Sequence, residues 1–241
     1  MIQSETTTTL AIIPAYNESG TIGRIVVDLR AQGFQVVVVD DCSVDDTGAR
    51  AEQAGATVLQ HPVNLGYGCA LQTGYLYAWR HDFQQVVQLD GDGQHDPRSA
   101  RELIQVLEQG RYDLVIGSRF LCAGSYRVPF LRRLGQKLFG AILNSLTGLG
   151  ITDPTSGYQA LSAEVIRFYC SRAFPDDFPD ANILLLLHRK RFRITETPVC
   201  MYVSNSGSMH SGLFQSTYYV IKMLFSIFIN LLIELPGESK K

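Results

Sequence analysis

Apolar residues in the first half of the chain fall into short β-branched runs that alternate with segments of helical hydrophobic spacing. The runs predict strands at 8–14, 35–40, 57–60, 84–89 and 112–117. The segments between them predict helices at 19–32, 45–54, 67–81 and 96–110. The run at 35–40 contains four consecutive valines, which is typical of a strand buried on both faces. This alternation predicts an α/β fold with a mainly parallel sheet flanked by helices.

The second half of the chain is less regular, and its pattern predicts helices at 132–146 and 180–191 and strands at 157–161 and 194–201. Ser162 is expected to cap a further helix, as Asp96 caps the helix before Gly110. We find neither internal repeats nor a low-complexity linker. The sequence therefore predicts one α/β domain over residues 1–212, followed by an apolar helix and tail over 213–241.

The C-terminal apolar run at 213–235 is long enough to cross a bilayer, but Lys222, Asn230 and Glu234 interrupt it. Its polar residues form one narrow stripe at helical spacing: Gln215, Lys222, Ser226 and Asn230. A helix that is apolar around most of its circumference is buried in protein or in lipid. Three interpretations stay open: a helix packed on the domain, a membrane span, and a helix lying in the membrane interface, which we favour.

The charge balance and the cysteines narrow the class of protein. Lys and Arg number 21 against 23 Asp and Glu, a net charge of −2, which disfavours a nucleic-acid binder. The cysteines are scattered and odd in number, so we expect neither a disulfide framework nor a zinc site, and a reducing compartment fits best. Residues 1–9 hold no apolar core, so we expect no signal peptide and a cytosolic chain.

The stretch Asp90-Gly91-Asp92-Gly93-Gln94 carries the most chemical information. Its carboxylates stand two residues apart at the end of a buried strand, so in extended chain they project the same way. Open α/β sheets bind ligands at the carboxyl ends of their strands. Paired Asp oxygens and a Gln carbonyl suit a hard cation such as Mg²⁺ or Mn²⁺, which in turn binds phosphate. The alternative is a solvated Asp-Gly turn.

Acidic and turn-forming residues also follow the first two predicted strands. Pro14-Ala15-Tyr16-Asn17-Glu18 comes after the first strand, and Asp40-Asp41 ends the second. These residues lie at the same predicted edge of the sheet, where acidic side chains accept hydrogen bonds from ribose hydroxyls and base N–H groups. For Asp45-Asp46-Thr47 we favour helix capping over ligand contact.

Three common motifs are excluded or disfavoured. Asn64-Leu65-Gly66-Tyr67-Gly68 is similar to a phosphate-binding glycine loop, but it fails as a dinucleotide fingerprint because Leu71 stands at the third glycine position. The chain lacks G-x-x-x-x-G-K-[ST], which excludes a P-loop NTPase, and lacks G-x-S-x-G, which disfavours an esterase fold.

Taken in order, these motifs resemble those of a family 2 glycosyltransferase of GT-A fold, in its polyprenol-phosphate branch, which includes dolichol-phosphate-mannose-synthase-like enzymes. The resemblance covers about residues 8–212. It also uses two further segments, namely Gly117-Ser118-Arg119-Phe120 and Asp153-Pro154-Thr155-Ser156-Gly157-Tyr158. Each motif alone is weak, and their order makes the resemblance specific.

The resemblance implies an inverting transfer from a nucleoside-diphosphate sugar to a polyprenyl phosphate, on the cytosolic face of a membrane and with a membrane protein as a further candidate partner. It assigns Pro14, Tyr16, Glu18 and Asp41 to the nucleotide. It assigns Asp90, Asp92 and Gln94 to Mg²⁺ or Mn²⁺ and the diphosphate. The catalytic set it implies is Asp92, Arg119, Arg132 and Asp180, with both arginines on phosphates and Asp180 near the position that activates an acceptor hydroxyl in other members.

Some positions depart from the family pattern and leave the acceptor open. Ser204 stands where relatives often carry a basic residue, for which His210 is a substitute unless it is simply solvated, and Gln136 stands where some relatives have Ser. The alternatives are a glycosyltransferase with a saccharide or protein hydroxyl as acceptor, and a non-catalytic nucleotide-binding module that recruits a membrane partner. The basic segment at 188–193 either faces anionic lipid or is a solvated helix end.

Overall fold

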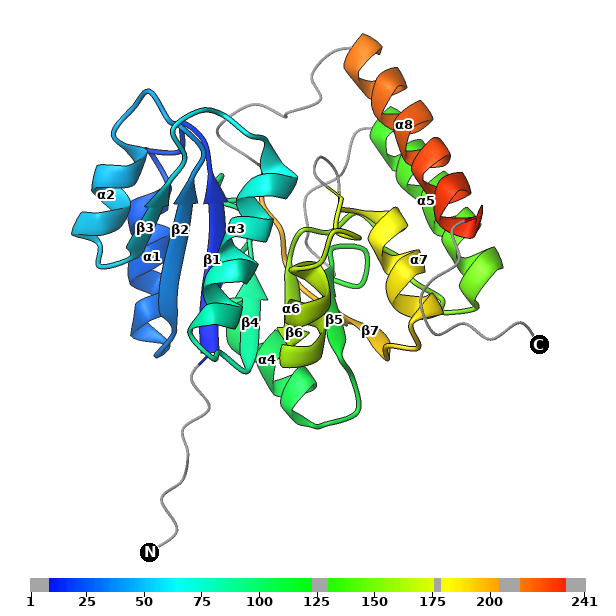
Figure 1. Ribbon diagram of the computed structural model, residues 1–241, viewed down its shortest axis with the longest axis horizontal. Coiled ribbons are helices and arrows are strands. Elements are labelled where there is room, and N and C mark those ends of the chain that lie inside the picture. Colours follow the sequence, from blue (N-terminus) through cyan, green and yellow to red (C-terminus); the bar gives the residue numbers. More distant parts are fainter. Residues whose placement is uncertain (1–8, 123–129, 176–178, 204–212, 233–241) are drawn as a thin grey trace, which may run out of the picture.

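The computed structural model describes residues 9–122, 130–175, 179–203 and 213–232. Its centre is a seven-stranded sheet in the order β3-β2-β1-β4-β6-β5-β7 (Figure 1). The strands are β1 (Thr9–Ala15), β2 (Gln35–Asp40), β3 (Thr57–Gln60), β4 (Gln85–Gln88), β5 (Leu114–Ser118), β6 (Gln159–Ser162) and β7 (Ile194–Pro198). The predicted α/β class with a mainly parallel sheet is confirmed. The strand bounds agree with the expected runs to within a few residues.

One strand runs against the others. β6 pairs antiparallel with β4, from Gln85↔Ser162 to Gln88↔Gln159, and antiparallel with β5 on its other side. β5 and β7 are again parallel to each other. The hydrophobic pattern predicts a strand here but contains no signal for its direction, because a short apolar run reads alike in both senses. The reversal matters because the segment that enters β6 reaches the edge at which β4 and β5 end.

Helices cover both faces of the sheet (Figure 1). They are α1 (Ile22–Ala31), α2 (Thr47–Gln53), α3 (Tyr67–Arg80), the short 3₁₀ helix η1 (Pro97–Ser99), α4 (Ala100–Glu108), α5 (Phe130–Thr147), α6 (Ala163–Tyr169), α7 (Ala181–Arg189) and α8 (Leu213–Leu232). The predicted caps are present. Asp96 and Ser162 accept hydrogen bonds from backbone amides of the turns that they begin.

The two cores follow from the alternation of side chains along the strands. Leu10 and Ile12 of β1 belong to the cluster beneath α3, α5, α6 and α7, whereas Ala11 and Ile13 belong to the cluster beneath α1, α2 and α4. α3 lies close to the sheet because Gly74 has no Cβ, which would stand 2.4 Å from Ile12 Cγ2. The sheet is therefore buried on both faces, as its continuous apolar runs predict.

A disulfide joins Cys122 to Cys200, with a Cα–Cα distance of 5.6 Å. The expectation of no disulfide is therefore wrong. The physical reason is the pairing of β5 with β7 in register Ser118↔Pro198, which brings together two cysteines that are 78 residues apart in the sequence. Cys42, Cys69 and Cys170 take no part in a disulfide. The cysteine pattern thus no longer indicates a reducing compartment.

α8 packs on the domain through the buried apolar residues Met223 and Ile227 and through polar contacts with α7. The Asn182 side chain of α7 donates to Ser226 Oγ at 2.9 Å, and Asn230 Nδ2 donates to the Asn182 carbonyl at 3.1 Å. Other large apolar side chains point outward, and Phe225 and Leu232 are 61% and 66% exposed. Among the described residues, no helix combines the length and apolar character required to cross a bilayer.

Candidate active site

The candidate site lies where β1, β2, β4 and β5 end, at the upper edge of the sheet in Figure 1. The segments that follow these strands carry Tyr16, Asp41, Asp90 and Arg119. The antiparallel β6 begins at the same edge, so the turn at 153–158 joins them there. The strand order thus brings together most of the motifs that the sequence singles out.

The loops after β1 and β2 are tied to each other by short hydrogen bonds. The Asn17 amide donates to Ser43 Oγ at 2.9 Å, and the Val44 amide donates to Asn17 Oδ1 at the same distance. The Glu18 amide donates to Thr47 Oγ1 at 2.8 Å. The loop that holds Pro14, Tyr16 and Glu18 is therefore fixed against the loop of Asp40 and Asp41. Asp45 accepts from the Thr47 amide, which agrees with the preferred capping role of this segment.

Asp41 is buried, and its carboxylate organises the next loop. Oδ1 accepts from the Leu65 amide at 2.8 Å and contacts His61 Nδ1 at 2.7 Å, while Oδ2 accepts from the Gly66 amide at 2.8 Å. Amides of the glycine-containing loop at 64–68 are therefore bound to Asp41 and are not available to a phosphate. The sequence motif does not predict these bonds to Asp41, and no sequence pattern singles out His61 as its partner.

Asp90 is oriented by two aromatic residues that sequence reasoning missed. The Tyr67 hydroxyl donates to Asp90 Oδ1 at 2.8 Å, and the Asp90 amide donates to His95 Nδ1 at 3.0 Å. Burial, followed by the charge of Asp90, holds the pKa of Tyr67 well above its usual value, so the hydroxyl stays protonated and donates. Tyr67 lies inside the glycine-containing motif at 64–68 and His95 directly follows the acidic motif at 90–94, but only the fold brings both to Asp90.

Asp92 and Gln94 sit in a turn and not in extended chain. β4 ends at Gln88, and the chain turns over 91–93, with Gly93 at a φ of 79°. Asp92 Oδ1 accepts from the Gln94 amide at 2.9 Å. The expectation that strand alternation makes Asp90 and Asp92 project the same way is therefore wrong, because the strand has ended before them. Their proximity follows from the tight turn.

The donor set at this turn suits a divalent cation whose coordination is completed by other ligands. Asp90 and Asp92 supply carboxylate oxygens, Gln94 supplies an amide oxygen, and a Tyr67 hydrogen bond fixes one Asp90 oxygen. Among the described residues, no group of three His, Cys, Asp or Glu side chains is placed to hold a metal ion by itself. Mg²⁺ is characteristically bound by one or two carboxylates together with substrate phosphates, so the residues present fit such an ion.

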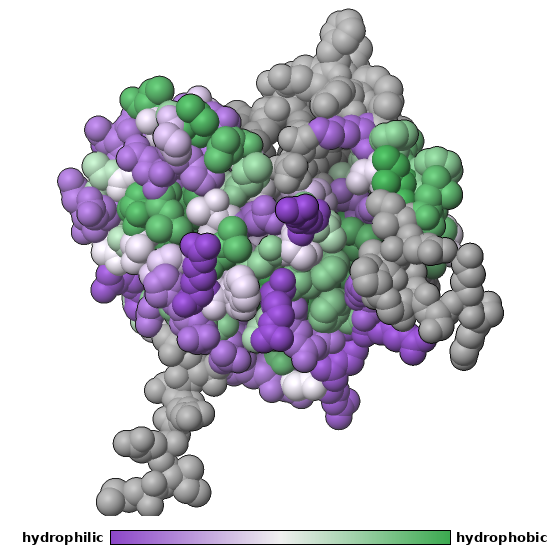
Figure 2. All heavy atoms as spheres, in the orientation of Figure 1, coloured by the Kyte–Doolittle hydropathy of each residue, from purple (hydrophilic) through white to green (hydrophobic). Residues whose placement is uncertain are grey.

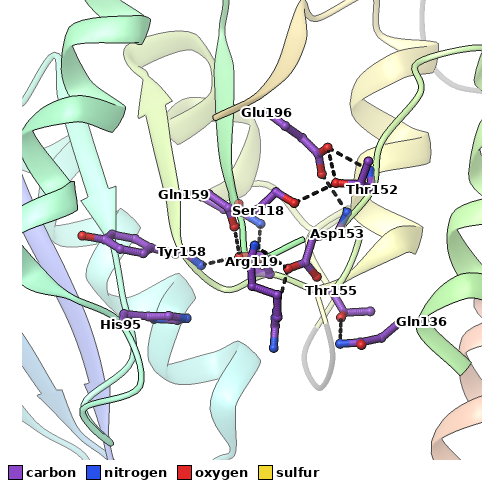
Figure 3. A network of polar contacts seen from close by, with 12 residues as sticks. His95, Ser118, Arg119, Gln136, Thr152, Asp153, Thr155, Tyr158, Gln159 and Glu196 are labelled. Atoms are coloured by element: carbon purple, nitrogen blue, oxygen red, sulfur yellow. Dashed lines mark hydrogen bonds and ion pairs between the residues drawn. The ribbon is translucent and has the colours of Figure 1, made fainter. Parts of the chain in front are cut away.

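Arg119 follows β5 and lies in a buried polar network (Figure 3). Its Nε donates to Asp153 Oδ2 at 2.6 Å, and its backbone amide donates to the same oxygen at 3.2 Å. Glu196 of β7 accepts from the Asp153 and Thr152 amides, both at 2.8 Å. Burial, reinforced by the Asp153 charge, raises the pKa of Glu196. The guanidinium is thus held by Asp153, and the 152–153 turn that carries Asp153 is held in turn by Glu196 of β7.

The turn at 153–158 connects this network to Asp90. Gln136 of α5 is buried and donates to Thr155 Oγ1 at 3.0 Å. Gly157 packs so closely that a Cβ would stand 2.7 Å from the Tyr67 hydroxyl and 3.3 Å from Asp90 Oδ1. Tyr158 stacks on the His95 ring, with centroids 4.9 Å apart. One turn therefore contacts both the acidic and the cationic parts of the site.

Asp180 also reaches this region. It is half-buried immediately before α7, and its charge contributes to raising the pKa of Tyr67, although less than burial and Asp90 do. Arg132 lies in α5, but its side chain is outside the described residues, as are Ser204 and His210. The structure thus places Asp90 and Arg119 on either side of the 153–158 turn, with Asp180 close enough to Tyr67 for its charge to act on that hydroxyl.

Comparison with known proteins agrees with this geometry. Residues 10–169 match the family model "Glycosyl transferase family 2". The chain is 34% identical to a polyprenol monophosphomannose synthase of Mycolicibacterium smegmatis over 66% of its own length and 63% of the relative's. It is 32% identical to an undecaprenyl-phosphate mannosyltransferase of Micrococcus luteus over 66% of its own length and 68% of the relative's.

The fold is also that of solved glycosyltransferases. A crystal structure of glucosyl-3-phosphoglycerate synthase from Mycobacterium tuberculosis with Mn²⁺, UDP and phosphoglyceric acid has a TM-score of 0.70. The match covers 96% of this chain and 81% of that one at 19% identity, so it compares the fold alone. The chain therefore has the GT-A fold. More particularly, the chain belongs to glycosyltransferase family 2.

Proposed function

We propose that this chain transfers a hexose from a nucleoside-diphosphate sugar to a polyprenyl phosphate at the cytosolic surface of a membrane. Family membership gives the reaction type, and relatives named for polyprenol and undecaprenyl phosphates support the acceptor. The observation that carries the proposal is the turn at 153–158, which contacts Asp90 on one side and Arg119 on the other. This contact supports a site in which a donor half and an acceptor half adjoin.

In the donor half, Tyr16, Glu18 and the loop after β2 hold the nucleotide, while Asp90, Asp92 and Gln94 hold Mg²⁺ or Mn²⁺. The cation supplies Lewis-acid stabilisation of the negative charge that develops on the departing diphosphate. Tyr67 and His95 keep Asp90 in place for that task. Asp41 acts at one remove, because its oxygens accept from the Leu65 and Gly66 amides and so shape the loop beside the nucleotide.

In the acceptor half, Arg119 and Arg132 orient the acceptor phosphate, and the guanidinium geometry suits this role. Asp153 fixes the Nε side of Arg119, so the plane of the guanidinium is set before substrate arrives. The reaction forms a bond from the acceptor phosphate oxygen to the anomeric carbon and breaks the bond from that carbon to the diphosphate. Attack from the opposite face inverts the configuration.

α8 supports placement at a membrane surface. Its polar residues Ser226 and Asn230 face α7, so its outward face is apolar. A helix of this kind lies in the interface with its apolar face in lipid. We therefore propose that residues 1–212 form the transferase domain and that 213–241 associate with the membrane.

A second candidate is transfer to a saccharide or protein hydroxyl. The half-buried Asp180 favours it, because its charge acts on Tyr67, the hydroxyl that donates to Asp90. A hydroxyl needs a general base, and a carboxylate at this place fits that role.

The test incubates the full chain with membranes and a panel of radiolabelled nucleotide sugars, followed by extraction of lipid-linked product. We expect labelled lipid with one donor, in a form released by mild acid as free sugar. Label in protein or glycan instead supports the hydroxyl acceptor. Absence of turnover with every donor, together with retained nucleotide binding, identifies a non-catalytic module and overturns the proposal.

A further inference from the structure

A concave surface lies at the edge of the sheet opposite the candidate active site. It is a groove of about 630 Å³ between the end of α5, the end of α7 and the start of β7. Its lining is Leu146, Leu149, His188, Arg189, Arg191, Phe192, Arg193 and Ile194. β7 begins at Ile194 and runs parallel to β5, so this groove opens where the strands begin and the active site where they end. It takes no part in sugar transfer as described above.

The groove combines an apolar lining with arginines held in different ways. Arg193 is fixed by a two-pronged ion pair with Asp113, with Nη2–Oδ1 and Nε–Oδ2 distances of 2.9 and 3.1 Å. Arg189 donates to the Asn230 carbonyl of α8. The Arg191 guanidinium is exposed, and within the described ranges it makes neither a hydrogen bond nor an ion pair. A cation is therefore presented at the mouth of the groove, with no acidic partner among those residues.

The backbone of Arg191 adds an independent observation. Its φ is 64°, in the left-handed region where glycine is favoured after a helix. The turn is fixed by hydrogen bonds from the Arg191 amide to the His188 carbonyl at 2.8 Å and from the Phe192 amide to the Leu187 carbonyl at 3.0 Å. An arginine occupies this strained position although a glycine would fit the turn better. The long cationic side chain is therefore not required by the turn itself.

The groove is continuous with the apolar side of the molecule. Arg189 links it to α8, and α5 contributes the exposed side chains of Leu138 and Leu146. Figure 2 shows hydrophobic residues gathered on the side where α5 and α8 lie. An apolar stripe beside a cationic rim is the complement of a bilayer surface that carries anionic headgroups.

We propose that this groove binds the phosphate of an anionic phospholipid headgroup, with Arg191 as the main cationic contact and Leu146 against the lipid chains. The contact fixes the rotation of the domain about α8, because α8 alone can roll in the interface. This inference rests on the proposed membrane placement and goes beyond it by naming a headgroup site away from the catalytic edge.

The test measures flotation of the full chain with vesicles of phosphatidylcholine alone or with phosphatidylglycerol added. Arg191→Gly is the informative variant, because glycine suits the φ of this position and the variant is expected to fold at least as well. The control is Arg80→Ala, which removes an exposed arginine outside the groove. Alanine is used there because a glycine would weaken the end of α3.

We expect the wild type to bind both vesicle types and to prefer the anionic one. A cation near an anionic surface contributes about 1 kcal/mol, which corresponds to about fivefold in affinity. Arg191→Gly should lose about fivefold on anionic vesicles only, Arg191→Lys should retain binding, and Arg80→Ala should match the wild type. Added salt should erase the difference between wild type and Arg191→Gly.

Equal binding of Arg191→Gly and wild type to anionic vesicles overturns the headgroup site. A wild type that binds both vesicle types equally also overturns it and leaves the proposed membrane placement intact. A wild type that binds neither overturns both. Sugar transfer to a detergent-solubilised acceptor should be unchanged in Arg191→Gly, which separates this site from the catalytic one.

Discussion

The hydroxyl of Tyr67 donates a hydrogen bond to Asp90 Oδ1 over 2.8 Å. The first residue of α3 thereby orients the first carboxylate after β4, although the two are 23 residues apart. Because one oxygen of Asp90 is held in this way, the orientation of the other is set as well. The site is therefore prepared before a nucleotide sugar arrives, which lowers the cost of organising it in the transition state.

Tyr67→Phe should lower kcat/KM by about 10-fold or more, because a hydrogen bond to a charged group contributes about 1.5–3 kcal/mol. The change removes one oxygen and leaves the ring in place. Transfer rates and the Mg²⁺ concentration for half-maximal rate are the measurements. Tyr77→Phe on the same helix is the matched control and should behave as wild type. Equal rates for the Tyr67 and Tyr77 variants would show that the bond has no catalytic role.

Asp92→Asn should abolish transfer, and wild-type activity should need added Mg²⁺ or Mn²⁺. A hard-cation site with few protein oxygens loses its ion when one charge is removed, so the loss should exceed the 10–100-fold typical of outer partners. The matched control is Asp82→Asn, an exposed Asp at a φ of 57° that Asn also adopts. Full wild-type activity in excess chelator would contradict the metal assignment of Asp90, Asp92 and Gln94.

The ranking of Asp180→Asn against Arg132→Ala should identify the acceptor. A phosphate monoester has a second pKa near about 6 and needs no base at pH 7, whereas a hydroxyl gains about 10²–10⁴-fold from one. If the acceptor is a lipid phosphate, Asp180→Asn should lower the transfer rate slightly and Arg132→Ala should lower it strongly. The reverse order would favour the hydroxyl acceptor.

Arg119→Ala should also lower the transfer rate strongly, but this variant needs its own control. Arg119 is buried with Asp153, and removing one partner of a buried ion pair costs about 3–5 kcal/mol of stability. Thermal unfolding must therefore accompany the rate measurement. Arg119→Lys keeps the charge and loses the planar guanidinium, so a folded but slow lysine variant would assign the effect to phosphate orientation. A folded, fully active lysine variant would contradict it.

Gly157→Ala should reduce transfer with a modest loss of stability. The added methyl group would stand 2.7 Å from the Tyr67 hydroxyl, so Tyr67 must shift and release Asp90. Gly135→Ala in α5 is the control, because a Cβ there meets nothing within 4 Å and alanine favours the helix. Combining Gly157→Ala with Tyr67→Phe should cost less than the sum of the two, since both act on the same bond.

The stability of the unliganded chain should depend on His95 below neutral pH. Burial lowers the pKa of His95 from 6.5 to about 4, because the folded site disfavours the imidazolium. Neutral His95 therefore stabilises the fold above pH 6.5, and this contribution is lost as the pH falls from 6.5 toward 4. Urea unfolding across that range should show the loss in wild type and in the exposed-site control His81→Gln. A flatter profile is expected for His95→Gln.

The sequence predicts the helices and strands well because the spacing of hydrophobic residues reflects the local geometry of the chain. It predicts the shared edge of Tyr16, Asp41 and Asp90 because parallel strands end together. It misses the direction of β6, and with it the contact of Gly157 with Asp90, because strand direction is a property of the whole sheet. The Cys122–Cys200 disulfide is missed for the same reason.

The sequence predicts where the site residues lie better than it predicts which groups their side chains contact. Asp41 carries the right chemistry for a ribose, yet its oxygens are bound by His61 and by the amides of Leu65 and Gly66. The polar stripe of α8 is visible in the sequence, but the side of the molecule that it faces depends on its hydrogen bond with Asn182 of α7. Tertiary hydrogen bonds of this kind leave no period in either segment.

The strand order divides the sheet into two parts, each built from one continuous stretch of sequence. Residues before 89 build β3, β2, β1 and β4, and residues 114–198 build β6, β5 and β7. The two pieces meet along a single seam, from Gln85↔Ser162 to Gln88↔Gln159. A recombination crossover between β4 and β5 thus exchanges a whole half of the sheet and disturbs one strand pairing. Under the proposed function, such a crossover is expected to change the acceptor specificity and to retain the residues that bind the donor.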